Sequence, residues 1–62
     1  MDLYTSLAAV DRVIARVQKR RERLDAENKT RFDRLVAARH AQGKLTTEQQ
    51  AALRRVADAA GA

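Results

Sequence analysis

The stretch Val17–Phe32, VQKRRERLDAENKTRF, decides whether the first two thirds of the chain form one helix or two. On either side of it, apolar residues recur at the three- and four-residue spacing of an amphipathic helix. Inside it, Arg21, Asn28 and Arg31 take positions where that spacing calls for an apolar side chain. Its segment DAENKT also contains weak helix formers and candidate caps for a new helix.

The helical phase of the apolar residues favours a helix that continues through this stretch. At about 100° per residue, the apolar residues before and after it fall on the same face of a helical wheel. A loop has no need to preserve that phase. The chain contains no Pro, and its first Gly is Gly43. We therefore predict one helix over about 2–42 with Asp2 as its N-cap, and a break near 25–30 as the alternative.

A second, shorter helix is indicated after Gly43. This Gly follows the helical run AARHAQ and suits the left-handed residue that commonly ends a helix. Thr46 or Thr47, each followed three residues later by a Gln, can form a capping box. The pattern predicts a helix over about 46–60 that ends at Gly61.

The predicted fold is all-α, a helical hairpin of one long helix (about 2–42) and one short helix (about 46–60). The short helix spans about 22 Å at 1.5 Å per residue, so it covers only the later half of the long helix. The chain is then one small domain with an N-terminal arm (1–28) and a hairpin (29–62), assembled into an oligomeric coiled coil or bundle. The alternative is a monomeric three-helix bundle with a break near 25–30.

The arm of the hairpin carries an apolar stripe that the short helix cannot reach. Burying its six apolar side chains would contribute about 9–18 kcal/mol, which is comparable to the stability of a whole domain. The spacing alternates four and three, as in a heptad repeat, and a polar Asn at one core position is typical of a dimer with a fixed register. We expect a homo-oligomer, with a dimer favoured, or another protein as partner. The predicted interface is Leu3, Leu7, Val10, Ile14, Val17, Arg21, Leu24 and Asn28.

A basic ridge lies opposite the apolar stripe on the same helical wheel, and the acidic residues gather on another side. Like charges four residues apart repel each other by a few tenths of a kcal/mol, so such a ridge indicates contact with phosphates or an acidic protein surface. A solvated charged face is the plainer explanation. No aromatic residue lies on the ridge to stack on bases. Its members are Arg12, Arg16, Lys19, Arg20, Arg23 and Arg34.

Composition limits the remaining classes of function. The chain has 62 residues and a net charge of +5, from 13 Lys and Arg against 8 Asp and Glu. It has no Cys and a single His, so we expect no disulfide, metal or cofactor. No apolar run approaches the roughly 18 residues of a membrane span, and the first residues lack the basic start of a signal peptide. We expect a cytoplasmic protein, or a virion component.

These features together predict a non-catalytic protein, because helices of this length form no cleft that could shift the pKa of an acid or a base. Its expected role is protein–protein interaction or assembly through the amphipathic N-terminal helix. It would be an accessory protein, a virion-associated phage component or a modulator of a partner protein. The alternative is a small basic dimer that binds nucleic acid through the ridge, and no small-molecule substrate is expected.

Overall fold

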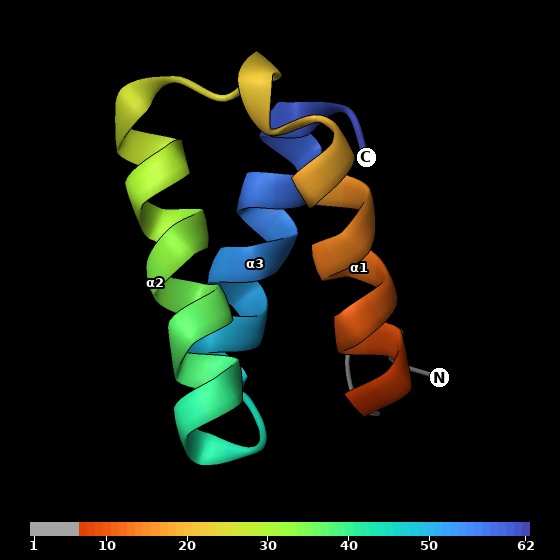
Figure 1. Ribbon diagram of the computed structural model, residues 1–62, viewed down its shortest axis with the longest axis vertical. Helices are drawn as coiled ribbons and strands as arrows, with labels where there is room; N and C mark the ends of the chain where they lie inside the picture. Colours follow the sequence, from red (N-terminus) through yellow and green to blue (C-terminus); the bar gives the residue numbers. More distant parts are fainter. Residues whose placement is uncertain (1–6) are drawn as a thin grey trace.

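Three α-helices and one short 3₁₀ turn make up the part of the protein that the computed structural model describes, residues 7–62. Helix α1 spans Leu7–Lys19, the 3₁₀ turn η1 spans Arg21–Arg23, α2 spans Ala26–Gln42 and α3 spans Thr47–Ala60. Helices α1 and α2 lie on either side of α3, which packs against both (Figure 1). Over residues 7–62 the fold is all-helical, as the sequence predicts.

The prediction of one unbroken helix over 2–42 is wrong. The α-helix stops at Lys19, and Leu24 has an extended backbone with φ −82° and ψ 144°. Helical structure resumes only at Ala26, so the break covers residues 20–25 and begins earlier than the 25–30 considered as the alternative. Asp2 and Leu3 lie outside the described residues.

Local hydrogen bonds explain why the chain breaks at this place. The side chain of Asp25 accepts a hydrogen bond from the backbone N–H of Asn28 at 2.8 Å, which caps the start of α2. Just before it, the N–H groups of Arg23 and Leu24 donate to carbonyls three residues back, at 2.9 and 3.0 Å. Several of the backbone groups released by the break therefore find partners within a few residues.

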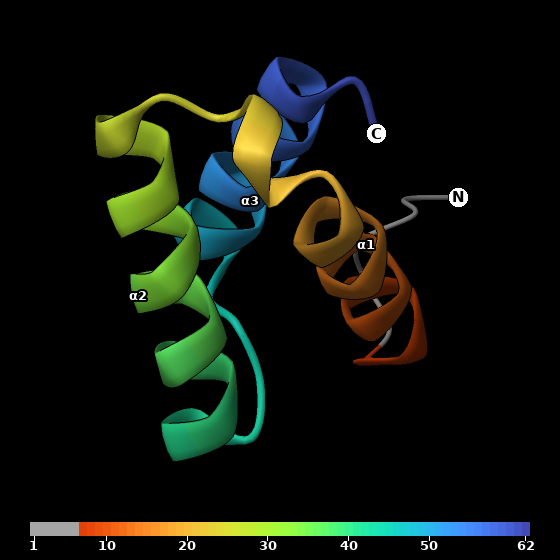
Figure 2. The ribbon, with the colours of Figure 1, turned by 45° about the horizontal axis from the view of Figure 1, so that its top comes forward.

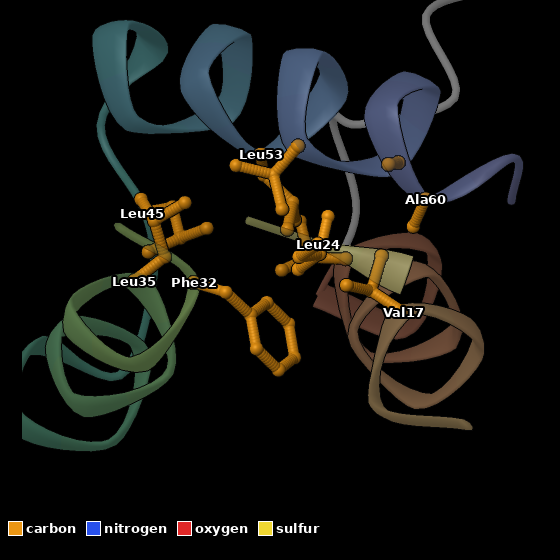
Figure 3. Packing of buried hydrophobic residues seen from close by; sticks show 10 residues of the cluster. Val17, Leu24, Phe32, Leu35, Leu45, Leu53 and Ala60 are labelled. Carbon is orange, nitrogen blue, oxygen red and sulfur yellow. The ribbon is translucent and has the colours of Figure 1, made fainter. Parts of the chain in front are cut away.

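The break lets α1 fold back onto the rest of the chain and form a core with it. Figure 3 shows side chains from all three helices pointing into the space between them. Leu24 from the break and Leu45 from the α2–α3 turn are buried there too. Removing this apolar surface from water is the main stabilising contribution to the fold. The buried core consists of Val10, Val17, Leu24, Phe32, Leu35, Leu45, Leu53, Val56, Ala57 and Ala60.

The turn between α2 and α3 has the predicted chemistry. Gly43 adopts the left-handed conformation with φ 72° and donates its N–H to the carbonyl of Arg39 at 3.0 Å. Thr46 and Gln49 form the capping box, each side chain accepting the other residue's backbone N–H at 3.1 and 2.9 Å. Gly61, also at φ 72°, ends α3. The sequence-based placement of the second helix is confirmed.

Helices α1 and α3 run in the same direction, while α2 runs opposite to both (Figures 1 and 2). The C-terminal ends of α1 and α3 therefore lie at the same end of the molecule. There the guanidinium group of Arg20 donates a hydrogen bond to the carbonyl of Gly61. A cation at this position offsets the partial negative charge that two helix C-termini bring together.

Truncation of the central core residue should unfold much of the protein. Leu53 is 0% exposed, and Leu53→Ala is expected to lower the free energy of unfolding by about 2–5 kcal/mol, because it removes buried methyl groups and leaves a cavity. Leu7→Ala is the matched control, since Leu7 is 44% exposed, and its effect should stay within about 0.5 kcal/mol. Urea unfolding followed by circular dichroism measures both. Equal losses would contradict the assignment of Leu53 to the core.

Candidate interaction surface

The residues predicted to form an apolar interface do not lie on one exposed edge. Val10, Val17 and Leu24 are buried in the core of the same chain, and Ile14 is half-buried against it. Leu3 lies outside the described residues. The expectation that this stripe faces water is therefore wrong for its buried members, because the break at residues 20–25 turns them toward α3.

The two polar residues of the predicted interface, Arg21 and Asn28, support the fold. Arg21 forms a two-pronged ion pair with Asp33 of α2, with Nε–Oδ1 and Nη2–Oδ2 distances of 3.3 and 2.7 Å. Its hydrogen bond lowers the pKa of the Asp33 carboxyl, and its charge lowers it further. Asn28 lies in the first turn of α2, and its backbone N–H donates a hydrogen bond to the side chain of Asp25. The two polar residues that interrupt the apolar stripe therefore act at the break between α1 and α2: Asn28 helps to start α2, and Arg21 ties η1 to α2.

One part of the predicted apolar interface stays accessible, near the start of α1. Among residues 7–62, Leu7 is the large apolar residue that stays exposed, with 44% of its surface accessible to solvent. Ile14 lies two helical turns further along the same side of α1 and is half-buried. Together they form a short apolar edge, much smaller than the stripe predicted from the sequence.

The outward side of α1 carries cations without acidic partners. Val10 and Val17 fix the inward side of the helix, so Arg12, Arg16 and Lys19 point away from the core. All three are exposed, and within residues 7–62 none of them forms a hydrogen bond or ion pair with another side chain. No acidic side chain among residues 7–62 is paired with these cations.

The one acid of α1 is occupied elsewhere and does not neutralise these cations. Asp11 binds Arg39 of α2 through two hydrogen bonds, Nε–Oδ1 at 3.0 Å and Nη2–Oδ2 at 3.2 Å. This pair links α1 to α2. The pair joins residues 28 positions apart, so no local sequence pattern predicts it.

Two further predicted ridge residues, Arg20 and Arg23, follow α1 in the chain. The guanidinium group of Arg20 donates a hydrogen bond to the carbonyl of Gly61. Arg23 also reaches Gly61: a methyl group at this position, as in alanine, would lie 3.5 Å from Nη1 of Arg23. Both guanidinium groups therefore reach the C-terminal end of α3 and remain exposed. With α1 they extend one basic surface around that end of the molecule. We call it the basic face: Arg12, Arg16, Lys19, Arg20 and Arg23.

Arg34 does not join the basic face, although the sequence places it on the same ridge. It lies on α2, next to buried Leu35 and two residues from buried Phe32, so it points away from the core. Helix α2 lies across the core from α1 (Figure 3). The ridge predicted on a single long helix is therefore divided between two surfaces by the break.

Residues 7–62 contain no group of three His, Cys, Asp or Glu side chains arranged to hold a metal ion. None of the helices in residues 7–62 combines the length and the apolar character needed to cross a lipid bilayer. His40 is exposed in the last turn of α2, where a cation suits the helix dipole.

Comparison with protein family models, with curated proteins and with solved structures gives no match for this chain. The described surface offers two features on which a function can rest, the basic face and the short apolar edge at Leu7 and Ile14.

Loss of the Arg21–Asp33 ion pair should change how stability depends on pH. Because the folded protein lowers the pKa of Asp33, the pair stabilises the fold above the ordinary carboxyl pKa of about 3.9. That contribution is lost as pH falls through the lowered pKa and Asp33 takes up a proton. Asp33→Asn should therefore lower the melting temperature at neutral pH, and the difference from wild type should close in acid.

Thermal unfolding between pH 7 and pH 2 tests this. Glu22→Gln is the control, because Glu22 is exposed and forms no ion pair among residues 7–62. A difference between wild type and Asp33→Asn that stays constant across this range would contradict the role of the pair.

Proposed function

We propose that the protein is a non-catalytic binding domain that docks on an anionic macromolecular partner through the basic face. The observation that supports it is the exposed run Arg12, Arg16 and Lys19 on the outward side of α1, none of which forms an ion pair within residues 7–62. Helix α1 is then the binding element, as expected from the sequence, but it acts through its charged side.

The distribution of charge over the three helices supports this placement. Residues 7–24 carry six basic and two acidic side chains, so this segment alone accounts for +4 of the net charge of +5. In α3, two Arg balance one Glu and one Asp. The acids of α2, Glu27 and Asp33, are both paired with Arg. The positive potential of the molecule is therefore concentrated on α1 and η1.

The free protein maintains this face at an energetic cost. Arg12 and Arg16 are four residues apart on one helix, and like charges at this spacing repel by about 0.2–0.5 kcal/mol. An anionic partner removes that repulsion and gains charge-assisted hydrogen bonds to guanidinium groups. Such a protein would need no cofactor, and it would act in the cytoplasm or as a virion-associated component.

Removal of the outward cations of α1 should weaken binding to a polyanion more than an equal loss of charge elsewhere. The test variant is Arg12→Gln/Arg16→Gln/Lys19→Gln. The control is Arg34→Gln/Lys44→Gln/Arg55→Gln, which removes three exposed cations from α2, the α2–α3 turn and α3. On heparin-agarose, the test variant should elute at a clearly lower NaCl concentration than the control, because local potential governs polyanion binding.

Equal elution of the two variants would mean that only net charge matters and would refute a defined binding face. Circular dichroism of both variants checks that the helices are intact, which we expect because all six side chains are exposed.

Assembly through the apolar edge of α1 is a second candidate, and we propose it on the exposure of Leu7 alone. A partner or a second copy that covers Leu7 and the accessible part of Ile14 would gain at most a few kcal/mol, since a fully buried Leu contributes about 1.5–3 kcal/mol. Assembly at this edge would therefore be reversible. The larger interface expected from the sequence has most of its apolar side chains in the core instead.

Leu7→Asp tests the second candidate without disturbing the core, because Leu7 is exposed. If the edge mediates self-association, wild type should show more than the mass of one chain in light scattering at high micromolar concentration, and Leu7→Asp should return it to one chain. Ala15→Asp, on the exposed outward side of the same helix, is the control and should keep the wild-type mass. Wild-type protein that is already a single chain under these conditions would remove self-association.

A further inference from the structure

Resting on the proposed function, the geometry points to one ligand for the basic face: we infer that it binds the phosphate backbone of a nucleic-acid duplex. A duplex differs from single strands, which expose their bases, and from acidic proteins, which carry carboxylates.

Aromatic side chains on the surface are what a single-strand binder needs, because unpaired bases stack on them. The sequence contains one Phe, one Tyr and no Trp. Phe32 is 0% exposed and reaches from α2 into the space between α2 and α1 (Figure 3). Tyr4 lies outside the described residues. Residues 7–62 therefore present no aromatic ring beside the basic face, which favours a duplex, whose bases are already stacked.

The make-up of the basic face favours phosphate over an acidic protein surface. Protein interfaces take most of their energy from a few large apolar, aromatic or Arg anchors that become fully buried in pockets of the partner. The large apolar side chains in the middle of α1, Val10 and Val17, are already buried in the core. Between the cations on the outward side lie only the small Ala8 and Ala15. This face therefore supplies charge and hydrogen-bond donors without an apolar anchor.

Residue type suits phosphate contacts without excluding carboxylates. Four of the five members of the basic face are Arg, the fifth being Lys19. The planar guanidinium group donates two parallel hydrogen bonds to a phosphate or to a carboxylate, a geometry that the ammonium group of Lys does not offer. Arg12, Arg16 and Arg23 lack side-chain partners within residues 7–62, so their donors are available for such contacts.

The dimensions of the face suit a backbone. From Arg12 to Lys19 the helix advances about 10 Å at 1.5 Å per residue. Duplex DNA carries one phosphate charge per about 1.7 Å of its axis. A helix laid against the duplex can therefore bring each cation near a phosphate, while Arg20 and Arg23 continue the contact beyond the end of α1. Backbone contacts of this kind supply affinity and carry no sequence information themselves.

Fluorescence anisotropy with defined ligands tests the inference on the full chain. The probes are a DNA duplex and an RNA duplex of about 20 base pairs, roughly two helical turns, the DNA single strand of the same sequence, and poly-glutamate. Both duplexes have the same phosphate chemistry, so binding to either supports the inference. The ratio of the two affinities shows whether DNA or RNA is preferred. The duplex should bind more tightly than the single strand and poly-glutamate at equal NaCl concentration.

The salt dependence provides a quantitative readout. If Arg12, Arg16 and Lys19 each contact one phosphate, replacing all three with Gln should reduce the slope of log K against log[NaCl] by about 2.7, since each contact contributes about 0.9. The control Arg34→Gln/Lys44→Gln/Arg55→Gln should keep nearly the wild-type slope. An unchanged slope in the test variant would overturn the assignment of the basic face to phosphate contacts.

The other outcomes separate this inference from the proposed function. Binding to heparin or poly-glutamate without binding to a duplex would overturn the inference and leave the anionic-partner proposal standing. Single-strand binding as tight as duplex binding would overturn the duplex assignment. If the protein binds none of these polyanions, both the duplex inference and the anionic-partner proposal are overturned.

Discussion

The hydrogen bond from the backbone N–H of Asn28 to the side chain of Asp25 starts α2 afresh, and the rest of the structure depends on that new start. A helix continuing through this point would carry Val10 and Val17 away from α3 and leave them in water. With the break, both are fully buried beside Leu53 and its neighbours. A chain of this length has little apolar surface to spare, so the local cost of ending a helix is outweighed by the surface that folding back buries.

The same fold-back determines which charges stay free. Each acid of α1 and α2 has an Arg partner: Asp11 with Arg39, Glu27 with Arg31 and Asp33 with Arg21. Two of these pairs join α1 and η1 to α2, and the third lies within α2. Exposed pairs of this kind contribute little stability individually. The Asp11–Arg39 pair also affects the surface, because it engages the one acid of α1 away from the cations of that helix.

The sequence was sufficient for the parts of the fold that local chemistry controls. Gly43, Thr46 with Gln49, and Gly61 each act within a few residues, and the structure has α3 where they place it. The shared apolar phase of the two segments predicts a continuous helix, and that prediction is wrong. Two helices that pack on the same third helix must both turn their apolar sides toward it, so a shared phase does not require one helix. Asp25, with Glu27 in the first turn of α2, was the local signal that could have located the break.

The candidate site was predictable only in part, for a related reason. The members of the basic face on α1 follow from helical spacing alone, but the exclusion of Arg34 depends on where α2 lies in space. The Asp11–Arg39 and Arg21–Asp33 pairs join residues 28 and 12 positions apart, and nothing in the sequence selects these partners over other acids and bases. Long-range pairing is decided by packing, which a helical wheel does not contain.

The parallel course of α1 and α3 has a mechanical consequence. The described part of the chain enters α1 at one end of the molecule and leaves α3 at the other (Figure 1). Tension applied between these two points therefore acts lengthwise along the contact between the two helices. The contact is loaded in shear, so its apolar side chains share the force and give way together, whereas an antiparallel pair pulled from adjacent ends would peel apart one turn at a time.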